Sequence, residues 1–526
     1  MEGLTPDEEA RLDAELEAFE DLARHELGLN GRAHWVEPVP SHFTVEDRTH
    51  TTVLFGGFTL AHDTLIAYAM RGLGYRIQQL GCPDDAALQT GKEFGNRGQC
   101  NPTYFTVGNL VKHLVELRDV RGLPTERIVE DYLFVTTGAC GPCRFGMYAT
   151  EYRKALRDAG FDGFRVLLFQ QQGGLEQATG ESDGLEIDHR FAIAFTKALL
   201  VGDILNLLGY RIRPYEVVPG STDDALALCR TIAGEALQTG GSVTLALYRC
   251  RRALAAVEVD RSAPKPLVSV IGEFWAMTTE GDGNYRLQRF LESEGAEVDI
   301  QPIVNWLLYL VWDLRFDIEH RSELREEDTG IFGLKGRNPT RDLWALKAMD
   351  LAVRGVFQVW ANVAGLHRYH LPDLDGIKRL ADGMYDANVK GGEGHMEVGK
   401  LVHFVEDATN HMTVSVKPFG CMPSSGVSDG VQSLVVSRYP DANFLAIETT
   451  GDGDVNVYSR IQMALFKARK RAQAEHEAAL EAAGLTQDTF RARLKRSRFG
   501  RALARPLHKV AGTSANLAYA MGSSNP

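Results

Sequence analysis

The chain has 526 residues, 44% of them hydrophobic, and its 57 basic and 70 acidic residues give a net charge of −13. This length predicts about three domains with sizeable cores, and the acidic balance argues against nucleic acid as the main partner. Seven cysteines in such a chain do not suggest a secreted disulfide framework. The first residues carry no signal-peptide pattern, and the most apolar run, 303–312, is too short to span a bilayer. We therefore expect a cytoplasmic protein without membrane insertion.

The first two regions are expected to be a helical arm and an α/β lobe. The arm, residues 1–48, contains an acidic amphipathic helix at 6–27 that stops at Gly28. In the first lobe, residues 49–170, apolar strand patterns alternate with helical patterns, one of which is a helix at 60–72. The expected strands are 51–55, 75–80, 132–135 and 164–169. Strands that alternate with helices indicate a mostly parallel sheet.

The remaining chain is expected to contain a helical middle region, a second lobe and a tail. Residues 171–264 are mainly helical, and 265–460 form a second α/β lobe behind an Ala-Pro-Lys-Pro linker. Its expected strands are 267–273, 297–300, 412–416 and 444–447. The fold class is therefore α/β, with two Rossmann-like parallel-sheet lobes, a helical middle segment and helical terminal extensions.

The tail, residues 461–526, is expected to be helical and basic. After Asp488 it has no acidic residue, and its eight basic residues are Arg491, Arg493, Lys495, Arg496, Arg498, Arg501, Arg505 and Lys509. This charge segregation suggests docking onto an acidic surface, either a second copy of this chain or a redox partner. The alternative is a solvated, partly disordered end.

Four cysteines lie in loops that glycine or proline keeps out of regular helix: Cys100, Cys140, Cys143 and Cys421. Loops of this kind hold thiolates toward one point, and an iron–sulfur cluster needs such soft ligands. Ligands bind at the carboxyl ends of parallel strands, and strands are expected to end near residues 135 and 416, just before Cys140 and Cys421. This placement predicts a metal centre between the two lobes.

Several alternatives to a cluster remain open. The four cysteines could be buried small hydrophobic residues, Cys140 and Cys143 could form a redox dithiol, or the four thiols could bind structural zinc. Cys82, before the helix-opening Pro83, is a possible spare ligand. Cys229 and Cys250 lie on helical patterns, which favours a structural role.

The same residues carry a resemblance to a known family. Pro83-Asp-Asp, Gly91-Lys, Cys100-Asn-Pro, Cys140-Gly-Pro-Cys-Arg-Phe-Gly and Pro418-Phe-Gly-Cys-Met-Pro occur in the order typical of the 2-hydroxyacyl-CoA dehydratase superfamily. This superfamily also includes benzoyl-CoA reductase-type subunits, and the chain most resembles its acyl-CoA dehydratase activase-related, double-cubane-like iron–sulfur proteins. The similarity spans about residues 50–465.

The resemblance implies an oxygen-sensitive [4Fe-4S] cluster, or a larger double-cubane-type cluster, bound by Cys100, Cys140, Cys143 and Cys421. It implies a reductase or dehydratase that acts on a small molecule such as an acyl-CoA thioester. Partners would be a second copy or a similar subunit, and a separate ATP-dependent activator, because this chain has no recognisable nucleotide-phosphate loop. Glu273 and Glu393 are candidate acid/base groups near the cluster, although each could simply cap a helix.

One departure from the family pattern favours another function. The acyl-CoA-reducing members usually bind their cluster with three cysteines and leave one iron open, whereas four motif cysteines are present here. The alternative function is therefore a non-catalytic electron-transfer or scaffold subunit with a fully cysteine-ligated cluster.

Overall fold

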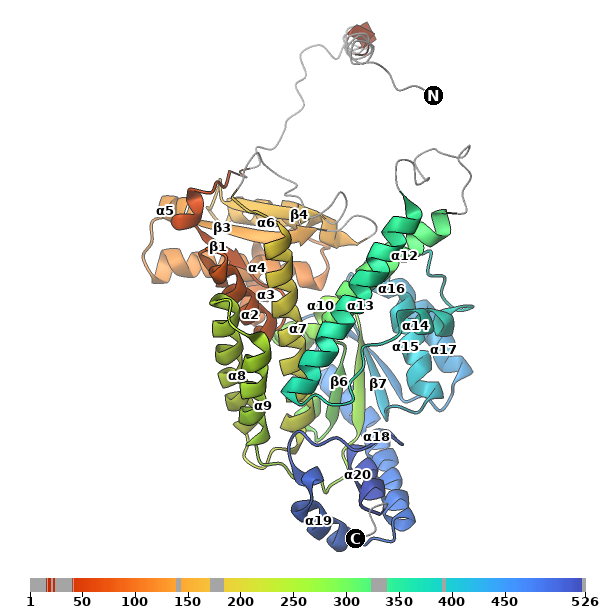
Figure 1. The fold of residues 1–526 in the computed structure, drawn as a ribbon. Coiled ribbons are helices and arrows are strands. Elements are labelled where there is room, and N and C mark those ends of the chain that lie inside the picture. The colour runs from red at the N-terminus through yellow and green to blue at the C-terminus, as the bar shows by residue number, and fades with distance from the viewer. Residues whose placement is uncertain are drawn as a thin grey trace. The chain divides into compact units, whose positions relative to one another are not determined.

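The computed structural model describes residues 16, 18, 19, 22, 23, 40, 42–138, 143–170, 184–322, 338–389 and 394–522 (Figure 1). Cys140 and Glu393 lie outside the described residues. The chain divides into two compact units, 1–40 and 41–526. In the first unit, all described residues of the expected helix at 6–27 are helical.

The first lobe is built on a parallel four-stranded sheet with the strand order β2-β1-β3-β4. Its strands are β1 Thr52–Phe55, β2 Ile77–Gln79, β3 Tyr132–Gly138 and β4 Arg165–Gln170. The helices that connect them are α2 Leu60–Gly72, α3 Asp85–Phe94, α4 Asn101–Val115, α5 Thr125–Asp131 and α6 Tyr148–Asp158. Strand β1 is central in the sheet and nearly all buried, as its apolar Val-Leu-Phe run predicts.

The second lobe repeats this plan with the strand order β6-β5-β7-β8, again entirely parallel. Its strands are β5 Leu267–Gly272, β6 Glu297–Ile300, β7 Met412–Pro418 and β8 Phe444–Thr449. Its helices are α10 Phe274–Thr278, α11 Leu287–Ser293, α12 Val304–Arg321, α13 Pro339–Ala364, α14 Leu374–Ala381, α15 Gly394–Glu406, α16 Met422–Ser425 and α17 Gln432–Arg438. The expected α/β class with two parallel sheets and helical additions is confirmed.

Three helices form the middle region: α7 His189–Ile212, α8 Ser221–Gln238 and α9 Val243–Ala255. Among the described residues, one helical segment, His189–Tyr215, is long and apolar enough to span a membrane. Of its most apolar window, 56% is buried inside the fold, and its residues share a hydrophobic core with α2 and with strands of the second sheet. The segment therefore has the packing of a core helix.

The carboxyl edges of the two sheets meet. Asp282 N, beyond β5 and α10, donates a hydrogen bond of 3.2 Å to Pro83 O, beyond β2. The ring centroids of Phe105 on α4 and Trp275 on α10 lie 5.7 Å apart. Loops from both lobes therefore share the interface at which parallel sheets place their ligands.

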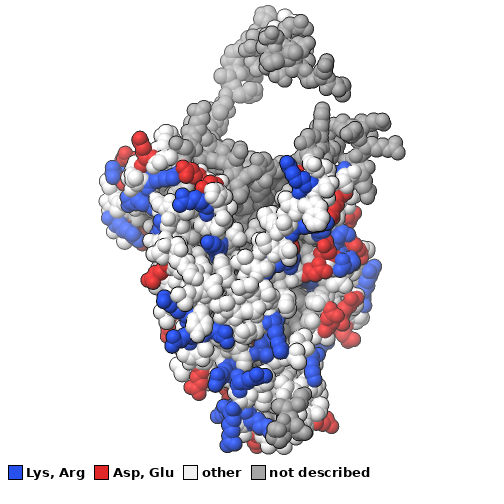
Figure 2. Space-filling model, in the orientation of Figure 1, with Lys and Arg blue, Asp and Glu red and all other residues white. Residues whose placement is uncertain are grey.

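The basic tail is folded onto the chain. It contains the end of α18 Asp454–Ala482, and also α19 Gln487–Arg496 and α20 Thr513–Gly522. These three helices share a separate hydrophobic core in which Phe490 is 0% and Leu494 is 3% exposed. The alternative of a solvated end is therefore wrong for this core, because apolar side chains at helical spacing bury one face. Lys and Arg gather on the part of the visible surface that carries α19 (Figure 2).

Candidate functional site

Cys100 lies at the amino end of α4, in a loop that a buried carboxylate holds in place. Glu151 on α6 is 3% exposed. Its carboxylate accepts hydrogen bonds from Asn96 N at 3.1 Å, Asn96 Nδ2 at 2.7 Å and Gln99 Nε2 at 2.8 Å. These bonds fix the backbone immediately before Cys100.

The thiol of Cys100 points into a polar, nearly enclosed setting. The residue is 6% exposed, and its Sγ lies 3.0 Å from Tyr148 Oη and 3.1 Å from Thr103 Oγ1. Burial raises the pKa of Tyr148 well above its usual value, and Cys100 adds to the shift. Both hydroxyls can donate to a thiolate sulfur, which is the kind of contact that tunes a bound cluster.

Cys421 reaches the same place from the second lobe. It follows β7, is 8% exposed and directly precedes α16. The preceding turn touches the first lobe, because Asn101 N donates a hydrogen bond of 2.9 Å to Phe419 O. Gly420 has φ +76°, and a Cβ there would lie 3.2 Å from Cα of Cys100. Only glycine fits this close approach without strain.

Cys143 is the first described residue after the gap that contains Cys140. It directly precedes a short helical turn, Arg144–Met147, and its Sγ accepts a hydrogen bond of 3.4 Å from Phe145 N. The next side chain ties this segment to the Cys100 loop, since Arg144 Nη1 donates to Gly98 O. The loops of Cys143 and Cys100 are therefore neighbours.

Electrostatic interactions connect Cys143, Cys421 and Glu273. Burial raises the pKa of Cys421 to about 12, with further contributions from Glu273 and from Cys143. Glu273 caps α10, where its Oε2 accepts from Ala276 N at 2.8 Å, and burial raises its pKa. It also contributes to the raised pKa of Tyr148. The candidate acid/base group Glu273 thus lies beside the cysteines, while also capping a helix.

A single metal ion and a cluster make different demands on the placement of the cysteines. Across the described ranges, no three His, Cys, Asp or Glu side chains lie close enough together to hold one metal ion. A single zinc needs its ligands around one point, whereas a cluster binds each thiolate to a different iron. The described candidate cysteines all stand immediately before a helix or a helical turn. Cys140 comes between β3 and Cys143 in the sequence, outside the described residues.

The other cysteines lie elsewhere. Cys229 and Cys250 are fully buried between α8 and α9, where each Sγ lies 3.6 Å from the carbonyl oxygen of the other residue. These contacts agree with the structural role expected for both. Cys82 is an exposed residue. Its thiol is nevertheless partly shielded from solvent, and this shielding, together with the negative charges of Glu280 and Asp63, raises the pKa of the thiol to about 12.

Asp63 is a titratable group that the sequence analysis missed. It lies at the start of α2, is 7% exposed, and accepts backbone hydrogen bonds from Gly57 N at 3.4 Å and Phe58 N at 3.3 Å. Burial raises its pKa to about 7, and Glu280 adds to the rise. A carboxyl group of this kind can exchange a proton at neutral pH. No local motif marks it, because Glu280 is distant in sequence.

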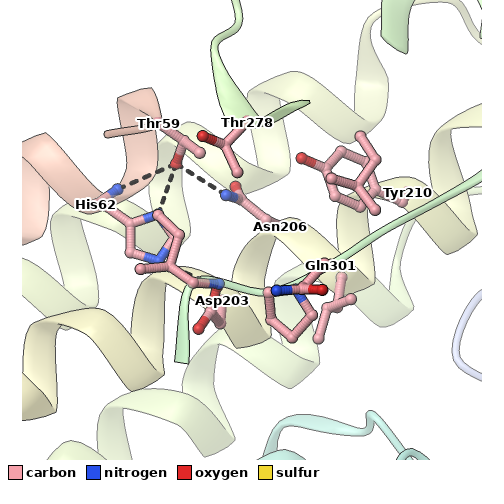
Figure 3. A pocket seen from close by; sticks show the side chains of 11 residues that line it. Thr59, His62, Asp203, Asn206, Tyr210, Thr278 and Gln301 are labelled. Carbon is pink, nitrogen blue, oxygen red and sulfur yellow. Dashed lines mark hydrogen bonds and ion pairs between the residues drawn. The ribbon is translucent and has the colours of Figure 1, made fainter. Parts of the chain in front are cut away.

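A buried polar cluster joins both lobes to the middle region (Figure 3). Asp203 on α7 accepts hydrogen bonds of 2.7 Å from Ile303 N and Val304 N at the start of α12. Its Oδ1 also lies 3.2 Å from Nε2 of His62 on α2, outside hydrogen-bonding geometry. Thr59 Oγ1 lies 2.7 Å from His62 Nδ1. The cavity beside these groups, about 10 Å³, holds no more than one water, so we assign the cluster a structural role.

Comparison of the chain with protein-family models found no matching family, and comparison with curated proteins found no significant match. The function of this chain is therefore inferred from the site itself and from the motif resemblance.

Proposed function

We propose that this protein is an iron–sulfur protein of the 2-hydroxyacyl-CoA dehydratase type. A [4Fe-4S] or larger double-cubane-type cluster would be bound between the lobes by Cys100, Cys140, Cys143 and Cys421. The observation that carries this proposal is the contact between loops of different lobes, in which Gly420 packs on Cys100 beside Cys421. A merely structural cysteine does not require such a meeting of loops.

When bound, such a cluster supplies single low-potential electrons. The chain's own residues would exclude water from the thiols, and the hydroxyls of Tyr148 and Thr103, which contact the sulfur of Cys100, would donate hydrogen bonds to its thiolate. Glu273, whose pKa burial raises, would lie next to the site as an acid/base group. Glu393 stays a second candidate for this role. The substrate would be a small molecule such as an acyl-CoA thioester.

A fully ligated electron-transfer subunit is the second candidate function. The near-complete burial of Cys100 and Cys421 favours it, because a substrate needs access to an open iron. EPR spectra of the anaerobically reduced protein, with and without an added acyl-CoA, separate the two functions. A spectrum changed by the thioester supports the reductase or dehydratase, and an unchanged spectrum supports electron transfer.

Two kinds of partner are expected for this chain, an electron donor and a further subunit. The electrons would come from a separate ATP-dependent activator, so the purified chain should not hydrolyse ATP by itself. The chain would also assemble with a second copy or a similar subunit. Helix α13 supports assembly, because it exposes an apolar stripe over several turns, with Trp344 and Leu351 each 72% exposed and Val359 58% exposed. The middle of the face in Figure 2, which α13 crosses, carries few charged side chains.

A further inference from the structure

A second cavity lies at the opposite end of the second sheet. It has a volume of about 480 Å³, and its walls include Leu267 and Glu297, the first residues of β5 and β6. Further walls come from the end of α7, the loop after α13, the end of α15 and the segment 502–516. The candidate cluster site is at the carboxyl edge of the sheets, so this cavity is separate from it.

The walls of this cavity are built by a hydrogen-bonded frame. Arg261, 4% exposed, donates to Ala504 O at 2.6 Å and to Ala502 O at 2.5 Å, which fixes the C-terminal segment over the cavity. Glu297 accepts from Tyr215 Oη at 2.9 Å and from Thr513 Oγ1 at 2.6 Å. The frame thus engages Arg261 and Glu297 in contacts within the protein.

The lining carries an excess of positive charge. Its arginines are Arg211, Arg261, Arg368 and Arg505, and its carboxylates are Glu297 and Asp299. The four arginines exceed the two carboxylates by two charges, before His370, His403 and His508 are counted. Within the described part of the chain, no carboxylate lies within ion-pair distance of Arg211, Arg368 or Arg505.

The excess charge is also felt by the neighbouring groups. Burial and, after it, the positive charge of Arg505 lower the pKa of Arg211 to about 9. Arg505 acts in the same direction on His508, whose pKa burial has already lowered. Glu297 and Asp299 offset part of this positive charge, and the remainder is an arrangement of like charges that costs stability in the free protein.

We propose that this cavity binds a small organic molecule that carries a phosphoryl dianion. Two negative charges would balance the excess, and guanidinium groups match phosphate oxygens in geometry and hydrogen bonding. The cavity is of ligand size and exceeds what a phosphate group alone would fill. Tyr369 and Phe404 line part of it and provide apolar area for the organic portion.

Thermal unfolding of the full chain, with ionic strength held constant by NaCl, tests this proposal. Phenyl phosphate is the probe, and inorganic phosphate, phenol and succinate are the comparisons. We expect a saturable rise in Tm with phenyl phosphate, a weaker one with inorganic phosphate, and none with phenol or succinate. Equal stabilisation by inorganic phosphate would remove the organic ligand from the proposal, and equal stabilisation by succinate would overturn the phosphoryl assignment.

Two variants localise the effect. Arg505→Gln should weaken phenyl phosphate binding at least tenfold, yet leave the Tm of the free protein unchanged or higher, because one crowded charge is removed. Arg501→Gln is the matched control, since it removes the same charge from an exposed position in the same segment. It should bind phenyl phosphate like the parent protein. No rise in Tm in the parent protein, or equal losses of binding in both variants, would overturn the proposal.

Discussion

Gly420 and Cys100 touch across the boundary between the lobes: a Cβ on Gly420 would lie 3.2 Å from Cα of Cys100. With φ at +76°, position 420 also has a backbone conformation that strains any other residue. The tip of the loop that carries Cys421 is thus shaped by its contact with the loop of Cys100. The two cysteines are kept together by backbone packing, before any metal is considered.

Gly420→Ala tests this contact. The substitution should lower the free energy of unfolding by about 1–3 kcal/mol, because it adds backbone strain and crowds Cys100. Denaturant unfolding measures the loss, and iron content measures the effect on the site. Gly426→Ala is the control, because Gly426 has ordinary helical angles and no atom within 4 Å of an added Cβ. Equal stability of the two variants would contradict the contact.

Replacement of single cysteines by serine should separate ligands from structural residues. Variants of Cys100, Cys140, Cys143 and Cys421 should lose most of their iron, since a hydroxyl is a poor soft ligand. Cys229→Ser and Cys250→Ser should keep it, although their stability should fall because a polar group is placed in a packed interior. Iron and sulfide content, measured on folded and anaerobically purified protein, gives the answer. Equal iron loss in all six variants would show the ligand assignment to be wrong.

Asp63 predicts a specific pH dependence of stability. Its pKa rises from 3.8 in the unfolded chain to about 7 in the folded protein. The folded state therefore loses stability as the pH rises through this interval, by about 4 kcal/mol in total. Asp63→Asn should remove this loss. The variant should therefore be more stable than the parent at pH 8, and this gain in stability should be smaller at pH 5.5. Denaturant unfolding at the two pH values measures the difference.

Asp188→Asn provides the opposite case for this experiment. In the parent protein, Phe191 N donates a hydrogen bond to the carboxylate of Asp188. This bond lowers the pKa of Asp188, so the charged form is favoured in the folded state. This variant should show no gain in stability at pH 8. If Asp63→Asn follows the parent protein at both pH values, the environment assigned to Asp63 is wrong.

The exposed stripe on α13 predicts self-association or association with a similar subunit. Trp344→Glu combined with Leu351→Glu should lower the mass measured by light scattering, because charges replace two exposed apolar side chains. Both positions are at the surface, so the fold should persist. Val455→Glu on α18 is the control, with a similarly exposed apolar residue (74%) on another surface. An unchanged mass in the α13 variant would remove this helix from the interface.

Much of the fold could be predicted from the sequence because its strands are short apolar runs between turn residues. The helix expected at 60–72 has the same bounds as α2, and the strand expected at 297–300 coincides with β6. The tail was harder to interpret. Its charge is obvious in the sequence, but Phe490 and Leu494 bury a face against α20, a contact that depends on the tertiary fold.

The candidate site was only partly predictable. Local motifs indicated Cys100 and Cys421, and the expected positions of the strands indicated that their loops would meet. The special environment of Asp63 could not be predicted, because its raised pKa depends on burial and on Glu280, more than 200 residues away. The same holds for Arg505, whose charge gains significance only from the cavity that segments distant in the sequence enclose.

The central claim is that the cysteine loops of the two lobes bind an iron–sulfur cluster. Determination of iron and acid-labile sulfide in the anaerobically purified protein tests it most directly. The proposal predicts iron and sulfide in similar amounts, at about four or more of each per chain, and loss of both in Cys421→Ser. Stoichiometric zinc without sulfide, or protein free of metal that keeps its fold, would contradict it.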